Sequence, residues 1–177
     1  MPQSQAQPPY RLALLAHSHE LAKHVRMVMR DRSDEMIYEF VDFETGPAMA
    51  RACLEAGSEV VICHGGTGNA ILRSLGHSVV AIDRTDMDVI KALRRAKQVS
   101  DHVILAAYRD ERHDLEEMEA LLDLKIHHIS YETHDALFRE INIAYERGIH
   151  LLVGGGGEQE IHGKSGRNRL CHRAQPA

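Results

Sequence analysis

The sequence predicts an α/β protein of two similar lobes, each a small parallel sheet with flanking helices in a three-layer α/β/α arrangement. Short β-branched or aliphatic runs alternate with helical stretches along the 177 residues. Helix-capping residues and glycines punctuate these stretches. The alternation restarts at Val103 without a close sequence repeat, so we expect a duplicated architecture rather than a duplicated sequence.

The first lobe is expected over residues 10–86. Its predicted strands are Leu12–Ala16, Ile37–Phe43, Val60–Cys63 and Val79–Ile82. Helices are predicted over His19–Arg30, over 47–56, and over the segment that contains Leu72 and Leu75. Pro47 suits the first turn of a helix, and Gly57 and Gly76 suit helix ends.

The second lobe is expected over residues 87–163 and includes a linking helix with an apolar stripe of Ile90, Leu93 and Ala96. Thr85 is its predicted cap, with Asp86 and Asp88 in the first turn near the positive end of the helix dipole. The further elements are strands Val103–Ala107, Ile126–Tyr131 and His150–Val153, and helices 112–122 and 134–146, the latter capped by Thr133 and ended by Gly148. Residues 1–9 are expected to be disordered, and 164–177 to form a poorly ordered tail.

Composition excludes several classes of function. A formal net charge of -5 argues against a nucleic-acid surface, which needs a basic footprint. Three cysteines without paired spacing indicate reduced thiols in a cytosolic protein. No run approaches the roughly 18 apolar residues of a membrane span, and Met1–Pro9 lacks an apolar signal region. We therefore expect a cytoplasmic protein with no membrane partner.

The most informative feature is the glycine-rich turn Cys63-His64-Gly65-Gly66-Thr67-Gly68, between a predicted strand and a helix. Gly65 and Gly66 allow close backbone approach, Thr67 adds a hydrogen-bonding side chain, and the helix start offers N–H groups. This pattern predicts that the turn binds a small anionic ligand without catalysing a reaction on it. The glycines equally suit a tight strand-to-helix turn with no ligand.

Other candidates follow strands too, since ligands of open α/β sheets lie beyond the carboxyl ends of the strands. Arg84 and Arg109 each follow a predicted strand and could pair with ligand carboxylates. The same pattern is equally typical of arginines in solvated loops. The candidate ligand-binding residues are His17, Ser18, His64, Gly65, Gly66, Thr67, Gly68, Thr85, Asp86, Tyr108, Arg109, Gly154 and Gly155.

Catalytic and metal motifs are lacking, so we expect a protein that is not an enzyme and has no metal or cofactor. Among 13 histidines, His17-x-His19 and His127-His128 lack the spacing of known zinc sites. No Gly-x-Ser-x-Gly elbow occurs. The segment Gly157–Ser165 resembles a phosphate-binding loop but has one residue too many between its glycines, and too little chain follows it for a nucleotide-binding fold.

A family resemblance rests on ordered segments: Glu59–Thr67, Ser78–Ile82, Met87–Leu93 and Ser100–Tyr108, and less tightly Tyr131, Thr133 and Val153-Gly154. Together they resemble the N-terminal sensor domain of propionate catabolism regulators, which are sigma-54-dependent transcriptional activators, over about three quarters of the chain. The resemblance implies a chelatase-like fold that binds a small organic acid, such as a methylcitrate-type tricarboxylate, between its lobes. It further implies ATPase and helix-turn-helix output domains in the full-length regulator and relief of ATPase inhibition on binding. We also expect a homodimer.

By position, the implied ligand contacts are His64–Thr67, Thr85-Asp86 and the turn at Gly154. Two departures matter. Asp86 stands where the family often has a small residue, and a carboxylate there would repel a polyanion. The usual C-terminal strand and helix are poorly matched.

Two alternatives stay open. Leu15–His19 and the Gly-Thr-Gly-Asn run at 66–69 resemble the phosphate-binding ends of methylglyoxal synthase, a small lyase, but the Gly-Gly-Asp loop that carries its general base is missing. A purely structural interaction module is the other alternative.

Overall fold

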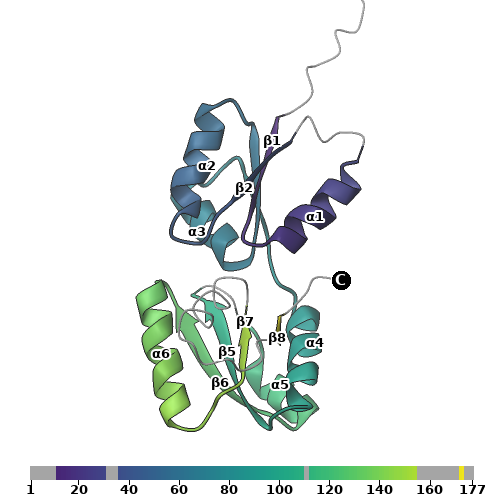
Figure 1. Ribbon diagram of the computed structural model, residues 1–177, viewed down its shortest axis with the longest axis vertical. Helices are drawn as coiled ribbons and strands as arrows, with labels where there is room; N and C mark the ends of the chain where they lie inside the picture. Colours follow the sequence, from purple (N-terminus) through teal and green to yellow (C-terminus); the bar gives the residue numbers. More distant parts are fainter. Residues whose placement is uncertain (1–10, 31–35, 110–111, 155–171, 174–177) are drawn as a thin grey trace, which may run out of the picture. The chain divides into compact units, whose positions relative to one another are not determined.

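The computed structural model describes residues 11–30, 36–109, 112–154 and 172–173, and the chain divides into two compact units, Met1–Ala81 and Ile82–Ala177. Each unit is built around a parallel sheet with helices on both faces (Figure 1). The predicted fold class is therefore confirmed.

The first unit holds four strands in the order β2-β1-β3-β4. Along the chain its elements are β1 (Leu12–Ala16), α1 (His19–Val28), β2 (Met36–Phe40), α2 (Gly46–Glu55), β3 (Val60–His64), α3 (Gly65–Leu75) and β4 (Val79–Ile82). The central strand β1 runs parallel to both neighbours, with Leu15 opposite Glu39 of β2 and Cys63 of β3. The next residue along each of β1 and β3, Ala16 and His64, is the last of its strand.

Two separate apolar clusters cover the two faces of this sheet. On one face Leu14 and Ala16 pack with Ala22 of α1. On the other, Ala13, Leu15 and Val61 pack with α2 and α3 through Ala50, Cys53 and Ile71. The helix after β1 thus lies on the opposite face from the helices after β2 and β3.

Local chemistry sets the element boundaries. Gly57 and Gly76 have φ of 98° and 69°, a region that glycine enters without strain, and they end α2 and α3 as predicted. The second strand was predicted to run to Phe43 but ends at Phe40. The reason is a turn: an Asp42 carboxylate oxygen accepts the N–H groups of Glu44 and Thr45 at 3.0 and 2.7 Å.

The second unit repeats the same strand order, β6-β5-β7-β8. Its elements are α4 (Asp86–Lys97), β5 (His102–Tyr108), α5 (Leu115–Leu122), β6 (Lys125–Tyr131), α6 (His134–Glu146), β7 (Leu152–Gly154) and β8 (His172–Arg173). Helices α4 and α5 share one cluster with β5 through Val89, Leu93, Leu105 and Met118. Gly148, with φ of 85°, follows α6 as predicted.

Three boundaries differ from expectation in this unit. Helix α5 begins at Leu115 rather than at 112, because the Asp114 side chain caps it by accepting the Glu117 N–H at 3.1 Å. Strand β7 is Leu152–Gly154 rather than 150–153. Residues 172–173, expected in a poorly ordered tail, pair with β7 as Val153↔His172 and Gly154↔Arg173. That pairing is long-range, and the local sequence carries no sign of it.

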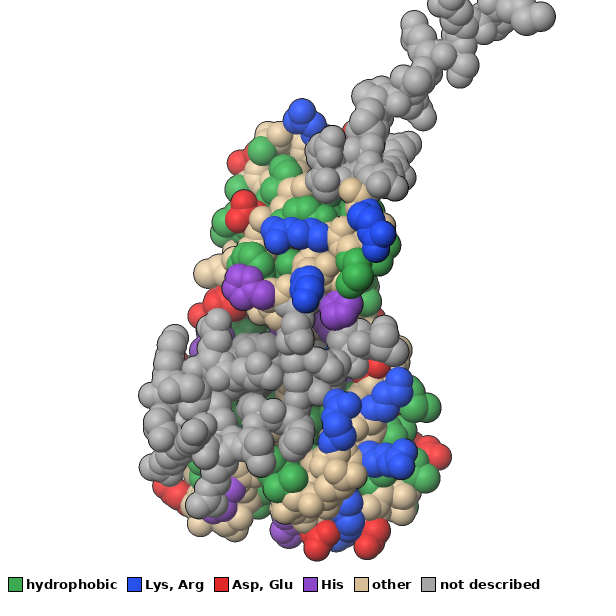
Figure 2. Space-filling model, turned by 45° about the vertical axis from the view of Figure 1, so that its right-hand side comes forward, with side chains coloured by type: hydrophobic (Ala, Val, Ile, Leu, Met, Phe, Trp, Pro, Cys, Tyr) green, Lys and Arg blue, Asp and Glu red, His purple; other side chains and the backbone are tan. Residues whose placement is uncertain are grey.

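The solvent face of α4 is basic. Lys91, Arg94 and Arg95 are exposed along it, and Figure 2 shows Lys and Arg side chains spread over the surface that this view brings forward.

Within the described residues, none of the helices is both long enough and apolar enough to cross a membrane.

Candidate functional site

The first unit has its topological switch point between β1 and β3. From β1 the chain passes to β2 on one side, whereas β3 lies on the other side, and the helices after β1 and β3 lie on opposite faces. At such a point the loops at the carboxyl ends of two adjacent strands diverge and leave room for a ligand. The predicted residues His17, Ser18, His64 and Gly65 flank this point.

The glycine turn has the geometry of an anion cradle. Helix α3 starts at Gly65, directly after β3, and His64 is its N-cap residue with φ of -134°. Among the described residues, no side-chain cap bonds to the first N–H groups of α3 or of α2, whereas α1, α4, α5 and α6 have such caps. Gly65 has φ of 59°, which explains why glycine stands there. The N–H groups of the first helical turn therefore lie at the carboxyl edge of the sheet.

Two predicted ligand residues serve packing. A Cβ on Gly68 would lie 3.2 Å from the Ala81 Cβ and 3.4 Å from the Cys63 carbonyl carbon, so glycine here lets α3 approach the sheet. The Thr67 side chain is buried, and its methyl group would lie 3.1 Å from a Cβ on Gly46 of α2. Glycine at 68 and the side chain of Thr67 therefore have a packing role, and whether their backbone N–H groups contact a ligand stays a prediction.

Side chains at the neighbouring strand end complete this edge. The rings of His17 and His64 stack with centroids 5.6 Å apart and an interplanar angle of 30°. Ser18 caps α1, its hydroxyl oxygen accepting the Leu21 N–H at 3.3 Å. Behind the turn, burial raises the pKa of the Cys63 thiol to about 11. Cys63 is therefore a neutral thiol at physiological pH and a poor nucleophile.

The second unit has the equivalent switch point between β5 and β7. Tyr108 ends β5 and Gly154 ends β7, and both are buried. Tyr108 meets Tyr131, at the end of β6, edge to face with ring centroids 5.9 Å apart. Gly155 lies outside the described residues, as does the segment Gly157–Ser165.

The polar candidates of the second unit have partners within the unit. The Thr85 hydroxyl accepts the Asp88 N–H at 3.2 Å, and the Asp88 carboxylate accepts the Thr85 N–H at 3.1 Å, a complete capping box. Arg109 pairs with Glu132 at 2.8 Å on the surface. These side chains therefore contact partners within their own unit.

Asp86 is engaged as well. Its carboxylate lies 2.7 Å from Nδ1 of His113, whose side chain is 4% exposed. Asp86, which we expected from the sequence to face the ligand, thus contacts an imidazole of its own unit. Close by, Arg84 Nη2 reaches the carbonyl oxygen of Ala106 in β5 at 3.5 Å. His113 was missed because it lies 27 residues from Asp86 and matches no motif.

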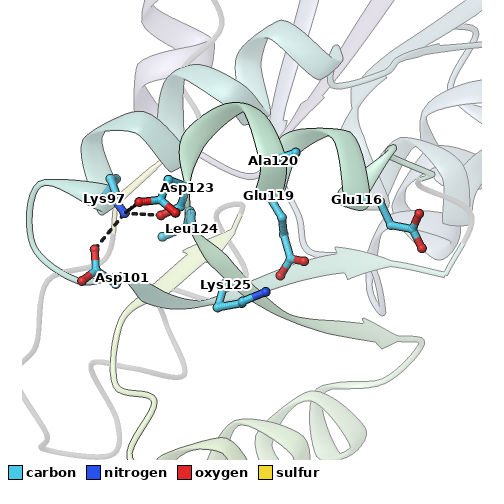
Figure 3. Close-up of a pocket in the computed structure, with 8 residues that line it drawn as sticks. All are labelled: Lys97, Asp101, Glu116, Glu119, Ala120, Asp123, Leu124 and Lys125. Carbon is cyan, nitrogen blue, oxygen red and sulfur yellow. Dashed lines mark hydrogen bonds and ion pairs between the residues drawn. The ribbon is translucent and has the colours of Figure 1, made fainter.

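A pocket of about 510 Å³ lies elsewhere, near the amino edge of the second sheet (Figure 3). Lys97 spans its rim, with Nζ 2.9 Å from the Asp101 carboxylate, 3.4 Å from that of Asp123, and bonded also to the Asp123 carbonyl. Glu116, Glu119 and Lys125 also line the pocket, so that its carboxylates outnumber its lysines. Its excess of carboxylates makes this pocket a poorer candidate for an anion than the strand ends.

Histidines and acids do not converge on a metal centre in the part of the chain that the structure describes, where no group of three or more His, Cys, Asp or Glu could hold an ion.

Together, the duplicated sheet order and the division into two units define the class as two-unit α/β proteins with parallel sheets. The family model of the propionate catabolism activator matches residues 30–171, and the chain belongs to that family. It is thus a sensing domain of transcriptional regulators, in agreement with the resemblance seen in the sequence.

Solved structures show the same fold. An NtrC family transcriptional regulator from Clostridium acetobutylicum superposes with a TM-score of 0.83 at 20% identity, covering 97% of this chain and 90% of that one. The ABC domain in complex with L-Trp from Streptococcus pneumonia superposes with a TM-score of 0.55 at 8% identity, covering 94% and 74%. A search of curated proteins found no match.

Proposed function

We propose that this domain senses a small organic acid on behalf of a sigma-54-dependent transcriptional activator and binds it without turnover. The observation that carries the proposal is the uncapped start of α3: a glycine turn at the switch point of the first unit presents backbone N–H groups to an anion. Family membership supports the regulatory role.

Binding without chemistry follows from the groups at this edge. Cys63 is held neutral by burial, so it is a poor nucleophile. Ser18 accepts a backbone hydrogen bond as a helix cap. The other groups at this edge are backbone N–H donors and two imidazoles, which can bind a carboxylate through hydrogen bonds.

The wider assembly is part of the same proposal. We infer that the full-length regulator carries ATPase and helix-turn-helix output domains and acts as a cytoplasmic homodimer, and that ligand binding relieves inhibition of the ATPase. That the second unit contributes Arg109 and the Gly154 turn to the same ligand stays a prediction from the sequence.

The test is calorimetry with propionate, succinate, citrate and 2-methylcitrate. We expect at least one to bind, and a ligand at about 100 times its dissociation constant to stabilise the fold by about 2.7 kcal/mol. Gly66→Val is expected to weaken binding at least about tenfold, because its side chain blocks close approach to the backbone.

Ser74→Val is the matched control, since it places the same β-branched residue at an exposed position of the same helix. It should fold and bind like the native chain. Failure of every acid to bind, or equal binding by both variants, would contradict the proposal. Nuclear magnetic resonance of the ligand after long incubation should show it unchanged.

A further inference from the structure

Helices α4 and α5 form one layer on one face of the second sheet. Val89 and Leu93 of α4 and Met118 of α5 are buried in the same apolar cluster. At the far end of the pair, Lys97 Nζ of α4 lies 3.4 Å from the carboxylate of Asp123, which follows α5. Because a shared core and this contact hold the two helices together, their outward faces form a single surface of fixed geometry.

The outward face of α4 carries positive charge. Met87, Lys91 and Arg94 recur at helical spacing on the side away from the buried stripe, and all three are exposed. Lys and Arg side chains are visible on the second unit in Figure 2. Within the part of the chain that the structure describes, neither Lys91 nor Arg94 has an ion-pair partner. This face therefore presents two cations that are not compensated by acids of their own chain.

The outward face of α5 carries the opposite charge. Glu116, Glu117 and Ala120 are exposed along it, opposite the buried Met118. The Glu116 carboxylate lies at the other end of α5 from Lys97 (Figure 3). Neither glutamate side chain forms an ion pair with a cation of the described residues. The layer thus has a basic face next to an acidic one.

A second copy of the chain supplies the complement of both faces at once. In a two-fold symmetric contact, α4 of each copy meets α5 of the other, and the same contact is made twice. Pairing α4 with α4 would place cations against cations, which is unfavourable. Met87 is 57% exposed. Its flexible thioether can pack against the small Ala120 of the other copy and give the contact an apolar centre.

We propose that α4 and α5 form the homodimer interface of this domain, with the Lys91 and Arg94 face of each copy on the Glu116 and Glu117 face of the other. This rests on the homodimer of the proposed function and gives that homodimer a location. Helices of 12 and 8 residues are about 18 and 12 Å long. A contact of this size is small, so the dimer is weak and depends on protein concentration.

Sedimentation equilibrium of the native chain over a range of concentrations tests the interface first. We expect a monomer–dimer equilibrium. The dissociation constant should rise at least about tenfold when the ionic strength is raised from about 0.05 M to about 0.5 M, because the interface charges are screened. A native chain that stays monomeric throughout, or a dimer indifferent to salt, would overturn the proposal.

Charge reversal then identifies the two faces. The double variants Lys91→Glu with Arg94→Glu, and Glu116→Lys with Glu117→Lys, should each raise the dissociation constant at least about tenfold, since like charges then meet at both contacts. A chain with all four substitutions should dimerise like the native chain, and an equimolar mixture of the two double variants should form a heterodimer. Because these rescues contain the same substitutions, they separate lost complementarity from misfolding.

Arg139→Glu is the matched control. It reverses an exposed arginine on α6, which lies on the other face of the second sheet from α4 and α5 (Figure 1). It should dimerise like the native chain. A dimer that survives the reversal of Glu116 and Glu117, or a chain with all four substitutions that stays monomeric, would show that these two faces do not meet.

Calorimetry with citrate and 2-methylcitrate on the same variants keeps this interface separate from the sensing function. Acid binding by a native chain that never dimerises would overturn the interface and leave sensing in place. A dimer that is lost and rescued as expected, in a chain that binds no acid, would support the interface and count against the sensing function.

Discussion

The two units share one strand order and differ at the edge where ligands bind. In the first unit the switch point carries glycines, a helix start without a side-chain cap, and stacked imidazoles. In the second it carries a capping box, an aspartate–histidine contact and a surface ion pair. The same fold therefore has two different edges: the first unit has a helix start without a side-chain cap, and in the second unit Thr85, Asp86 and Arg109 contact other side chains of that unit.

The largest expected effect concerns the free energy of unfolding, and it tests whether each unit unfolds independently of the other. Ile71→Ala in α3 and Leu93→Ala in α4 each remove a fully buried side chain, but from different apolar clusters. Each should cost about 2–5 kcal/mol. Hydrogen exchange should show lost protection only in the unit that carries the substitution.

Leu121→Ala removes a leucine that is 65% exposed and serves as the control, with little expected change. If either core substitution lowered protection equally in both units, the two clusters would belong to one cooperative fold, and the comparison would fail.

A smaller effect is expected at the capping box of α4. Thr85→Ala removes the hydroxyl that accepts the Asp88 N–H and should destabilise the second unit by about 1 kcal/mol in denaturant unfolding. Thr85→Ser keeps the capping oxygen and should behave nearly like the native chain. Equal loss in both variants would show that the threonine methyl group, and not the cap, matters.

The smallest effect is expected at Arg109 and Glu132, whose side chains are 48% and 57% exposed. A double-mutant cycle with Arg109→Gln and Glu132→Gln should give a coupling of about 0.5 kcal/mol or less, weaker still in high salt. A weak bridge leaves Arg109 available to a ligand carboxylate. A coupling above about 2 kcal/mol would make it a structural residue instead.

Local signals in the sequence were sufficient to predict most of the helices and strands and several of their ends. Thr85 and Thr133 were predicted as caps and do cap α4 and α6. Gly57, Gly76 and Gly148 were predicted as helix ends, and all have positive φ. These features depend on a few adjacent residues, whose backbone preferences are strong enough to be read without tertiary context.

Features that depend on the order of strands could not be predicted. That His17 meets His64 follows from β1 lying beside β3, 47 residues apart in sequence. The sequence alone suggests a ligand-binding role for Gly68. Its packing role becomes visible only in the structure, where the Ala81 side chain lies close to it. The partner of Asp86 and the pairing of β8 are likewise tertiary.

The burial of Cys63 has a consequence for oxidative stress. Peroxide reacts with thiolates, and a thiol with a pKa of about 11 is ionised in only about one molecule in ten thousand near neutral pH. Its sulfur is also turned toward the carbonyl of Val80, 3.7 Å away inside the sheet. Cys63 is thus the first residue of the glycine turn and yet should resist oxidation. We therefore expect the thiol at this edge of the domain to stay reduced when the cell is under oxidative stress.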